Sequence, residues 1–337
     1  MIKTINTIAD QLGAWSFGYA ISTGEQFEAD IRNSETKARL VWDSFLLLTS
    51  IPCAIASLVL LKISVWTTPF KGCHILKTES SPQTEDKEGE VHVSTWNINC
   101  IPFSKVLNNT ASMENRVTAI ANYILQLETP IVFVQEAYGN TPYKLRELLT
   151  HKFPTILDRM GIRAVGLDSG LACYTTLPVL DYEYIPFKED REDRPFMSHG
   201  FLAVKTASTL YIGTHLSSGD EKGELRFRQF AQIRNYVKAQ KEYSHFVIAG
   251  DLNIGENKTY PSKEYQSLNL EELDVASKKQ RSKETCTDEL KVGKENATCT
   301  RDDYILSSQK YKFSKLFLTN PKELSDHYAL TFYGANS

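Results

Sequence analysis

Polar side chains able to do chemistry follow short apolar runs at several points of the chain. The clearest case is residues 245–254 (HFVIAGDLNI), in which Asp251 and Asn253 are two residues apart. Side chains two apart on an extended backbone point to the same face. A carboxylate beside an amide can hold a phosphate, a metal ion or a nucleophilic water. The alternative is an ordinary turn at a strand end, because Gly, Asp and Asn all favour turns.

Further acidic, amide and histidine side chains border other apolar runs in the same way. Taken singly, each has an ordinary structural interpretation, such as a core histidine, a solvated glutamate or a turn asparagine. The last two in the chain are adjacent, and adjacent side chains on a strand point to opposite faces. These candidates are Asn97, Glu136, His215, Asp302, Asp303, Asp326 and His327.

Six pieces of sequence in this order resemble the endonuclease/exonuclease/phosphatase (deoxyribonuclease-I-like) superfamily over residues 91–333. The Asp-x-Asn and Ser-Asp-His pieces are the most specific. The resemblance implies an α/β (α+β) fold, a four-layer α/β/β/α sandwich of two packed, mostly antiparallel sheets over residues 91–335. The pieces are STWNIN (94–99), FVQEAY (133–138), GTHLSSGD (213–220), IAGDLNI (248–254), DDYIL (302–306) and SDHYAL (325–330).

The resemblance assigns a metal site and a phosphate site. Asn97 and Glu136 match the residues that hold the catalytic divalent ion. A carboxylate and an amide oxygen suit Mg²⁺, which keeps several waters and binds substrate phosphate, and Mn²⁺ is the alternative. Asp251 and Asn253 match the residues that position the nucleophile and contact the phosphate.

The resemblance also assigns two histidines, each with a carboxylate partner. His327 matches the general base that activates water, and Asp326 matches the aspartate that orients it. His215 matches the histidine that stabilises charge on the phosphoryl oxygens, and Asp303, with Asp302 as the second choice, matches its orienting aspartate. A base titrating near neutral pH and a cation facing the developing oxyanion are what in-line phosphodiester attack needs.

Within the superfamily, the chain is most similar to the neutral and bacterial sphingomyelinase branch. The similar pieces are residues 166–179, 199–205, 213–233 and 264–275, although residues 175–178 read TTLP where a Ser-Lys-x-Pro turn is usual. The resemblance implies hydrolysis of a phospholipid or sphingolipid phosphodiester, with sphingomyelin as the first choice. The alternatives are a nuclease, an inositol-phosphate phosphatase, and a membrane-bound interaction module without turnover.

Short apolar runs and helical repeats predict the elements that position these residues. Apolar residues recur at helical spacing from Val117 to Leu127 and from Phe230 to Val237. Strands dominate, which favours packed sheets with helices between some strands. The expected strands are residues 91–98, 131–134, 171–175, 182–187, 201–205, 210–213, 246–249, 304–307 and 328–332.

An apolar segment precedes the predicted catalytic domain. Residues 45–61 carry no charge, and Trp42 and Trp66 flank the segment where interfacial aromatics are expected. This predicts a transmembrane helix over residues 41–66 and a single-pass membrane location, whose orientation stays open; a buried core helix is the alternative. Residues 1–40 form an extension, and the polar, charged residues 67–90 are expected to be a linker.

Composition limits the expected partners. The net charge is −3, so the whole chain shows no basic footprint for nucleic acid, and a membrane lipid is the expected partner. We expect no protein partner. The six cysteines form no CxxC or Cys/His pattern, which argues against structural zinc. Cys286 and Cys299 can pair in an oxidising compartment, and the polar insert at residues 254–302 is either a disordered loop or a substrate lid.

Overall fold

The computed structural model describes most of the predicted catalytic domain and little outside it. The extension at residues 1–40, the expected transmembrane helix at 41–66 and most of the insert at 254–302, with Cys286 and Cys299, lie outside the described residues. Within the described part, no helix has the length and apolarity to cross a membrane. The described residues are 74–77, 84–101, 113–138, 141–161, 168–188, 198–219, 222–254, 274–275, 302–309, 311–319 and 324–336.

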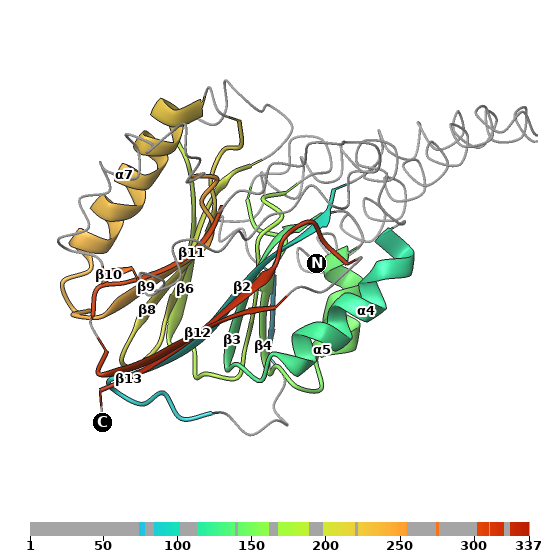
Figure 1. The fold of residues 1–337 in the computed structure, drawn as a ribbon, viewed down its shortest axis with the longest axis horizontal. Helices are drawn as coiled ribbons and strands as arrows, with labels where there is room; N and C mark the ends of the chain where they lie inside the picture. The colour runs from blue at the N-terminus through green and yellow to red at the C-terminus, as the bar shows by residue number, and fades with distance from the viewer. Residues whose placement is uncertain are drawn as a thin grey trace, which may run out of the picture.

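One sheet has seven strands in the order β1-β4-β5-β3-β2-β13-β12 (Figure 1). Its only parallel pair among the described strands is β2 with β3. The strands are β1 (His74–Lys77), β2 (Glu90–Cys100), β3 (Ile131–Ala137), β4 (Thr155–Asp158), β5 (Ala172–Thr175), β12 (Phe313–Thr319) and β13 (Ala329–Ala335).

The second sheet has six strands in the order β10-β11-β9-β8-β7-β6. Here β8 and β9 are parallel, and the other described pairs are antiparallel. The strands are β6 (Asp181–Pro186), β7 (Gly200–Lys205), β8 (Leu210–His215), β9 (Phe246–Asp251), β10 (Asp274–Val275) and β11 (Asp303–Ser307).

Helices cover the outer faces of the two sheets (Figure 1). Helices α4 (Met113–Gln126) and α5 (Thr141–Leu149) pack on the seven-stranded sheet, and α7 (Gly223–Ala239) packs on the six-stranded sheet. A third apolar cluster fills the space between the sheets. The predicted sandwich of two packed sheets with outer helices is therefore confirmed for the described residues.

The alternation of side chains along β3 shows how the sequence builds these layers. Val132 and Val134 belong to the cluster under α4 and α5, whereas Ile131 and Phe133 belong to the cluster between the sheets. Successive side chains on a strand point to opposite faces, so a strand buried on both faces is apolar throughout. This is why residues 131–134 read as a continuous apolar run.

Two β-α-β units carry the parallel pairs. In the first unit α4 connects β2 to β3, and in the second α7 connects β8 to β9. A parallel pair needs such a crossover, because both strands must begin at the same end of the sheet. Within each sheet, the carboxyl ends of the two parallel strands therefore lie at the same end. The hydrogen bond between Asn97 of β2 and Asp251 of β9 shows that the two sheets share this end.

The two sheets come very close at Gly213 of β8. A Cβ atom added there would lie 2.1 Å from Cδ1 of Phe133 on β3. No real Cβ tolerates that separation, so glycine at this position lets the Phe133 ring pack directly against the backbone of the other sheet.

Several elements differ from the sequence-based expectation. Residues 74–77, expected in a linker, form β1 and pair with β4. Asp86, also in the expected linker, accepts hydrogen bonds from the backbone N–H and Oγ of Ser208. The short strand β4, helix α5 and strand β12 were not predicted, because each has few apolar residues or mixes them with polar ones.

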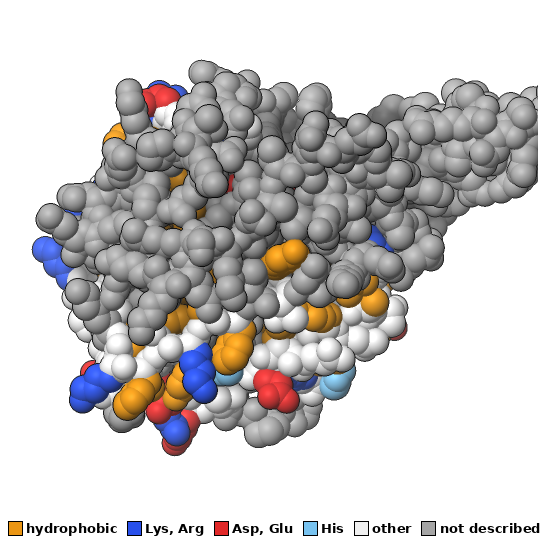
Figure 2. Space-filling model, viewed as in Figure 1, with side chains coloured by type: hydrophobic (Ala, Val, Ile, Leu, Met, Phe, Trp, Pro, Cys, Tyr) orange, Lys and Arg blue, Asp and Glu red, His pale blue; other side chains and the backbone are white. Residues whose placement is uncertain are grey.

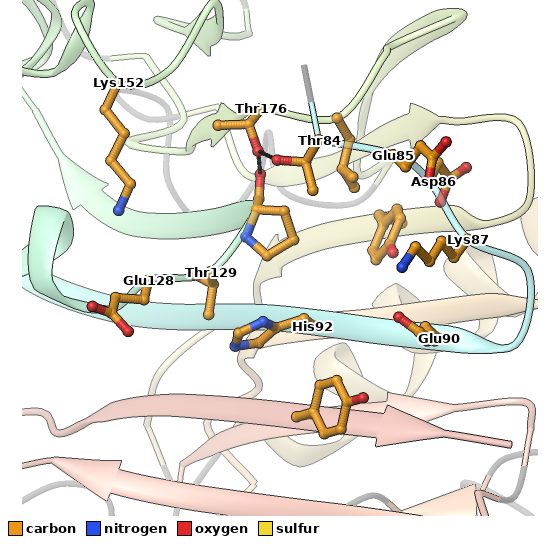
Figure 3. Close-up of a pocket in the computed structure, with 14 residues that line it drawn as sticks. Thr84, Glu85, Asp86, Lys87, Glu90, His92, Glu128, Thr129, Lys152 and Thr176 are labelled. Carbon is orange, nitrogen blue, oxygen red and sulfur yellow. Dashed lines mark hydrogen bonds between the residues drawn. The ribbon is translucent and has the colours of Figure 1, made fainter. Parts of the chain in front are cut away.

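A pocket of about 280 Å³ opens along the amino-terminal half of β2 (Figure 3). Its lining mixes carboxylates such as Glu90 and Glu128 with the ammonium of Lys152. None of the catalytic candidates lines it.

Candidate active site

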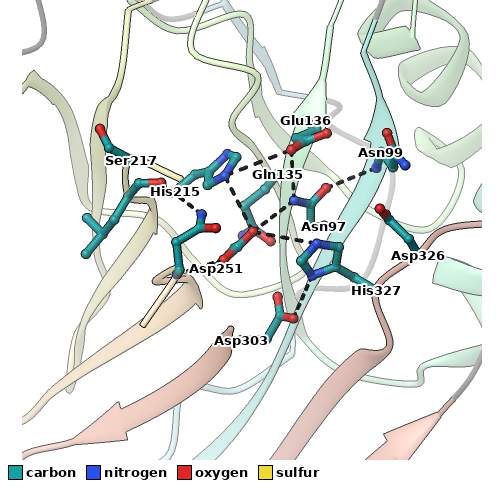
Figure 4. Close-up of polar contacts among 12 residues, drawn as sticks. Asn97, Asn99, Gln135, Glu136, His215, Ser217, Asp251, Asp303, Asp326 and His327 are labelled. Atoms are coloured by element: carbon teal, nitrogen blue, oxygen red, sulfur yellow. Dashed lines mark hydrogen bonds and ion pairs between the residues drawn. The ribbon is translucent and has the colours of Figure 1, made fainter. Parts of the chain in front are cut away.

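Four of the predicted residues meet at the carboxyl ends of the parallel strands (Figure 4). The side-chain amide of Asn97 donates to Oε1 of Glu136 at 3.1 Å and to Oδ2 of Asp251 at 3.0 Å. Nε2 of His215 lies 3.4 Å from the same Asp251 oxygen and 4.0 Å from Oε1 of Glu136. The two β-α-β units thus bring together residues that are up to 154 positions apart in the chain.

A histidine–carboxylate dyad completes the cluster. Nδ1 of His327 donates to Oδ2 of Asp303 at 2.8 Å, and its Nε2 lies 3.9 Å from Oδ2 of Asp251. Asp303 is fully buried and begins β11, where it pairs in register with Asp251 of β9. The dyad therefore bridges the two sheets, because His327 lies two residues before the first residue of β13, the last strand of the other sheet.

This pairing corrects two predicted partnerships. Asp303 was expected to orient His215 and Asp326 to orient His327, and both assignments are wrong. Asp326 and His327 are neighbours whose side chains diverge, so His327 takes its carboxylate partner from β11. His215 instead faces Asp251. Of the two candidates in the acidic pair, Asp303 is the one that enters the site.

Asp326 belongs to the Glu136 side of the cluster (Figure 4). Burial, together with the nearby charge of Asp326, raises the pKa of the Glu136 carboxyl from 4.5 to about 7. Such crowding of carboxylates is unfavourable unless a proton or a cation neutralises it.

The donor set fits a hard divalent cation. Glu136 and Asp326 offer carboxylate oxygens, which Mg²⁺ prefers, and a cation there would relieve their repulsion.

A second group of possible metal ligands lies beside them: Asp251, Asp303 and His327 have ligand atoms within 4.8 Å of one another. Because Asp303 and His327 hydrogen-bond each other, the Glu136 side is the better metal position. Oδ1 of Asn97 accepts the backbone N–H of Asn99 at 3.0 Å, so its role as a ligand stays a prediction.

Asn253 does not share a strand face with Asp251, as an extended backbone through both residues would require. The strand ends at Asp251, whose Oδ1 accepts the Asn253 backbone N–H at 2.9 Å in a tight turn. Asn253 has φ +49°, and its side-chain amide donates to the carbonyl of Leu216 at 3.0 Å. It therefore ties the end of β9 to the His215 loop.

Left-handed backbone recurs at this end of the molecule. Asn99, Glu136 and Asn253 have φ values of +46°, +59° and +49°. Such conformations are unfavourable for residues other than glycine and cluster at functional sites. Here they turn the chain immediately after, or at the end of, the strands that carry the site.

Residues 216–219, which follow His215, are held by α7. Arg226 donates to the carbonyls of Ser217 at 2.9 Å and Gly219 at 2.6 Å. Gln229 donates to Oγ of Ser217 at 2.9 Å and accepts its backbone N–H at 3.0 Å.

Two supporting residues were missed from the sequence. Oγ of Ser325 donates to the carbonyl of Asn97 at 2.6 Å and accepts the backbone N–H of His327 at 3.1 Å. The ring of His199 stacks on His215, with centroids 5.6 Å apart. The available signals were the serine of the SDHYAL piece and a histidine two residues before a predicted strand.

The chain matches known proteins in family and in fold. A family model described as the endonuclease/exonuclease/phosphatase family matches residues 94–327. No curated protein matches the chain.

Three solved structures illustrate the shared fold. Sphingomyelinase C from Streptomyces griseocarneus is 21% identical, covers 73% of this chain and 99% of its own, and has a TM-score of 0.55. A Staphylococcus aureus beta toxin mutant with bound magnesium ions is 18% identical (72% and 99% covered, TM-score 0.55). Truncated Caenorhabditis elegans TDP2 is 19% identical (74% and 100% covered, TM-score 0.57).

Proposed function

The chain belongs to the endonuclease/exonuclease/phosphatase family, and from this premise we propose that it is a metal-dependent phosphodiesterase acting on a phospholipid or sphingolipid headgroup. Sphingomyelin, cut to ceramide and phosphocholine, is the first substrate choice. The observation that carries the proposal is the His327–Asp303 dyad opposite Asp251 and His215.

The dyad supplies a general base. Because Nδ1 of His327 is held by Asp303, Nε2 is the nitrogen left to accept a proton on the side facing Asp251. A water between Nε2 and the substrate phosphorus loses its proton to His327 as its oxygen forms the new P–O bond. The bond to the lipid oxygen breaks on the opposite side, and that oxygen takes a proton from solvent water and leaves as the alcohol.

The remaining site residues determine how the negative charge of the phosphodiester is compensated. Four carboxylates surround the site (Glu136, Asp251, Asp303 and Asp326), so an anionic phosphodiester needs compensating positive charge. Glu136 and Asp326, with Asn97, would hold a divalent ion, which supplies charge stabilisation to the phosphoryl oxygens. His215, held by Asp251, faces the same region from the other sheet and adds a second donor.

Three observations support a lipid over a nucleic acid. The net charge is −3, and on the face seen in Figure 2 the described Lys and Arg side chains are scattered among acidic and hydrophobic ones. Phe313 and Phe317 on the edge strand β12 are 64% and 51% exposed. The uncharged residues 45–61 support membrane tethering, which raises the effective concentration of a lipid headgroup.

The test supplies sphingomyelin vesicles, DNA and soluble inositol phosphates side by side to the purified chain, with Mg²⁺ or with a chelator. We expect Mg²⁺-dependent release of phosphocholine from vesicles and its loss in His327→Ala. Faster cleavage of DNA or of inositol phosphates would replace the lipid assignment by a nuclease or a phosphatase. Equal inactivity of wild type and His327→Ala on every substrate would contradict the enzyme proposal.

A further inference from the structure

A buried arginine lies beneath the site at the beginning of α4. The Arg116 side chain is 3% exposed. Its Nη2 donates to the carbonyl of Asn99 at 2.6 Å, and its Nη1 donates to the carbonyl of Ile98 at 3.2 Å and to that of Leu324. The guanidinium thus binds three backbone carbonyls, and these belong to two separate segments of the chain.

Both segments carry proposed catalytic residues. Asn97 lies one residue before Ile98, and Asp326 and His327 follow Leu324 by two and three residues. The segments approach each other on their other side through the Ser325 hydroxyl, which donates to the Asn97 carbonyl at 2.6 Å. The Trp96 indole on β2 adds a third contact, because its Nε1 donates to the carbonyl of His327 at 3.1 Å. Arg116 is therefore one of several side-chain links between the end of β2 and the turn that precedes β13, and it is the one that bonds both segments with a single charged group.

The geometry points to Arg116 as a positioning residue. We propose that its forked guanidinium sets the distance between two parts of the site: the metal side, formed by Asn97 and Glu136, and the general base His327. This inference rests on the proposed function. A planar fork can bond two segments at once, whereas a lysine ammonium acts as a single point charge. The bond to Asn99 also holds a residue whose φ is +46°.

Helix α4 does not depend on this side chain for its packing. Ile120, Ala121 and Ile124 of the same helix are fully buried against the sheet. Removing the guanidinium is therefore expected to loosen the two segments more than the helix. Loss of position by about 1 Å can lower a rate by roughly 100-fold.

The experiment compares Arg116→Met and Arg116→Lys with the wild type. For each folded variant it measures kcat, KM, thermal unfolding, and Mg²⁺ affinity by calorimetry on the metal-free protein. We expect Arg116→Met to lower kcat about 10- to 100-fold with little change in KM, and to weaken Mg²⁺ binding. Arg116→Lys is expected to recover only part of this loss.

The matched control is Lys152→Met. Lys152 is another cation that donates to a backbone carbonyl, that of Leu125 in the last turn of α4 at 2.7 Å, and this carbonyl belongs to neither catalytic segment. Its loss should lower stability without changing kcat or Mg²⁺ affinity.

Two results would overturn the assignment. One is a folded Arg116→Met with wild-type kcat and Mg²⁺ affinity. If that variant does not fold, wild-type behaviour of Arg116→Lys serves instead, since donors on a single nitrogen cannot reproduce the spacing of the two guanidinium nitrogens that bond the segments. Failure of the proposed function can be told apart from failure of the Arg116 proposal. If the proposed function is wrong, the wild type turns over no phosphodiester, but the effect of Arg116→Met on Mg²⁺ affinity can still be measured.

Discussion

Two aspartates near His327 have different surroundings, and these surroundings decide what each can do. Asp303 is fully buried and hydrogen-bonds Nδ1 of the histidine. Asp326 is partly exposed and raises the pKa of Glu136 through its charge. The first therefore suits control of the histidine tautomer, and the second suits cation binding.

Amide substitutions separate these roles. Asp303→Asn should lower kcat about 100- to 10,000-fold while leaving Mg²⁺ affinity close to that of the wild type, because an amide fixes the wrong tautomer of His327. Asp326→Asn should instead weaken Mg²⁺ binding, since it removes a carboxylate beside Glu136. Steady-state kinetics and calorimetry on the metal-free protein measure the two effects. The reverse pattern would restore the Asp326–His327 partnership first predicted from the sequence.

At the scale of the elements, the sandwich depends on how closely β8 and β3 approach. Phe133 packs against the backbone at Gly213, and both lie between the sheets. Strand β3 ends at Ala137, directly after Glu136, and strand β8 ends at His215. Spacing between the sheets therefore bears directly on the spacing between the two halves of the site.

A methyl group at this contact provides a test. Gly213→Ala should destabilise the fold by about 1–3 kcal/mol, because its Cβ would lie 2.1 Å from the Phe133 ring. Phe133→Leu in the same chain should restore part of the loss by freeing space. Urea unfolding of the two single variants and the double variant measures this coupling. Strictly additive effects would show that the two side chains do not compete for the same volume.

The predictability of the elements follows their burial. β3, β8 and β9 were predicted because residues buried on both faces give continuous apolar runs, whereas β2 was predicted from β-branched and aromatic residues mixed with polar ones. β12 was missed because Ser314 and Lys315 interrupt its apolar residues at an exposed edge of the sheet. The Asp303–His327 partnership was missed for a different reason: it joins strands of different sheets, and local sequence patterns carry no information on such contacts.

At the scale of the whole molecule, His245 joins elements far from the active site. Its Nδ1 lies 3.1 Å from Oγ1 of Thr209, which precedes β8. Its Nε2 lies 3.3 Å from Oγ of Ser307 on β11. The same Nε2 lies 2.6 Å from the hydroxyl of Tyr311, which precedes β12. Burial lowers its pKa from 6.5 to about 4. The neutral ring is therefore part of the folded structure.

Acid should weaken the fold through this residue. The unfolded chain takes up a proton near pH 6.5 and the folded chain only near pH 4. The stabilisation is thus fully present above pH 6.5 and is lost as the pH falls toward 4, by up to roughly 3 kcal/mol. Urea unfolding between pH 4 and 7.5 should show a shallower loss in His245→Gln, which cannot titrate. Parallel pH profiles for the two proteins would exclude this origin.

The two β-α-β units have one more consequence, which concerns assembly. Asn97 and Glu136 come from the first unit, and His215 and Asp251 come from the second. Neither unit alone brings a base, an anchored histidine and a cation site together. The base His327 and its partner Asp303 belong to neither unit. Catalytic competence is thus a property of the two docked units together with these residues, so a partly opened chain that keeps both units folded has already lost its chemistry.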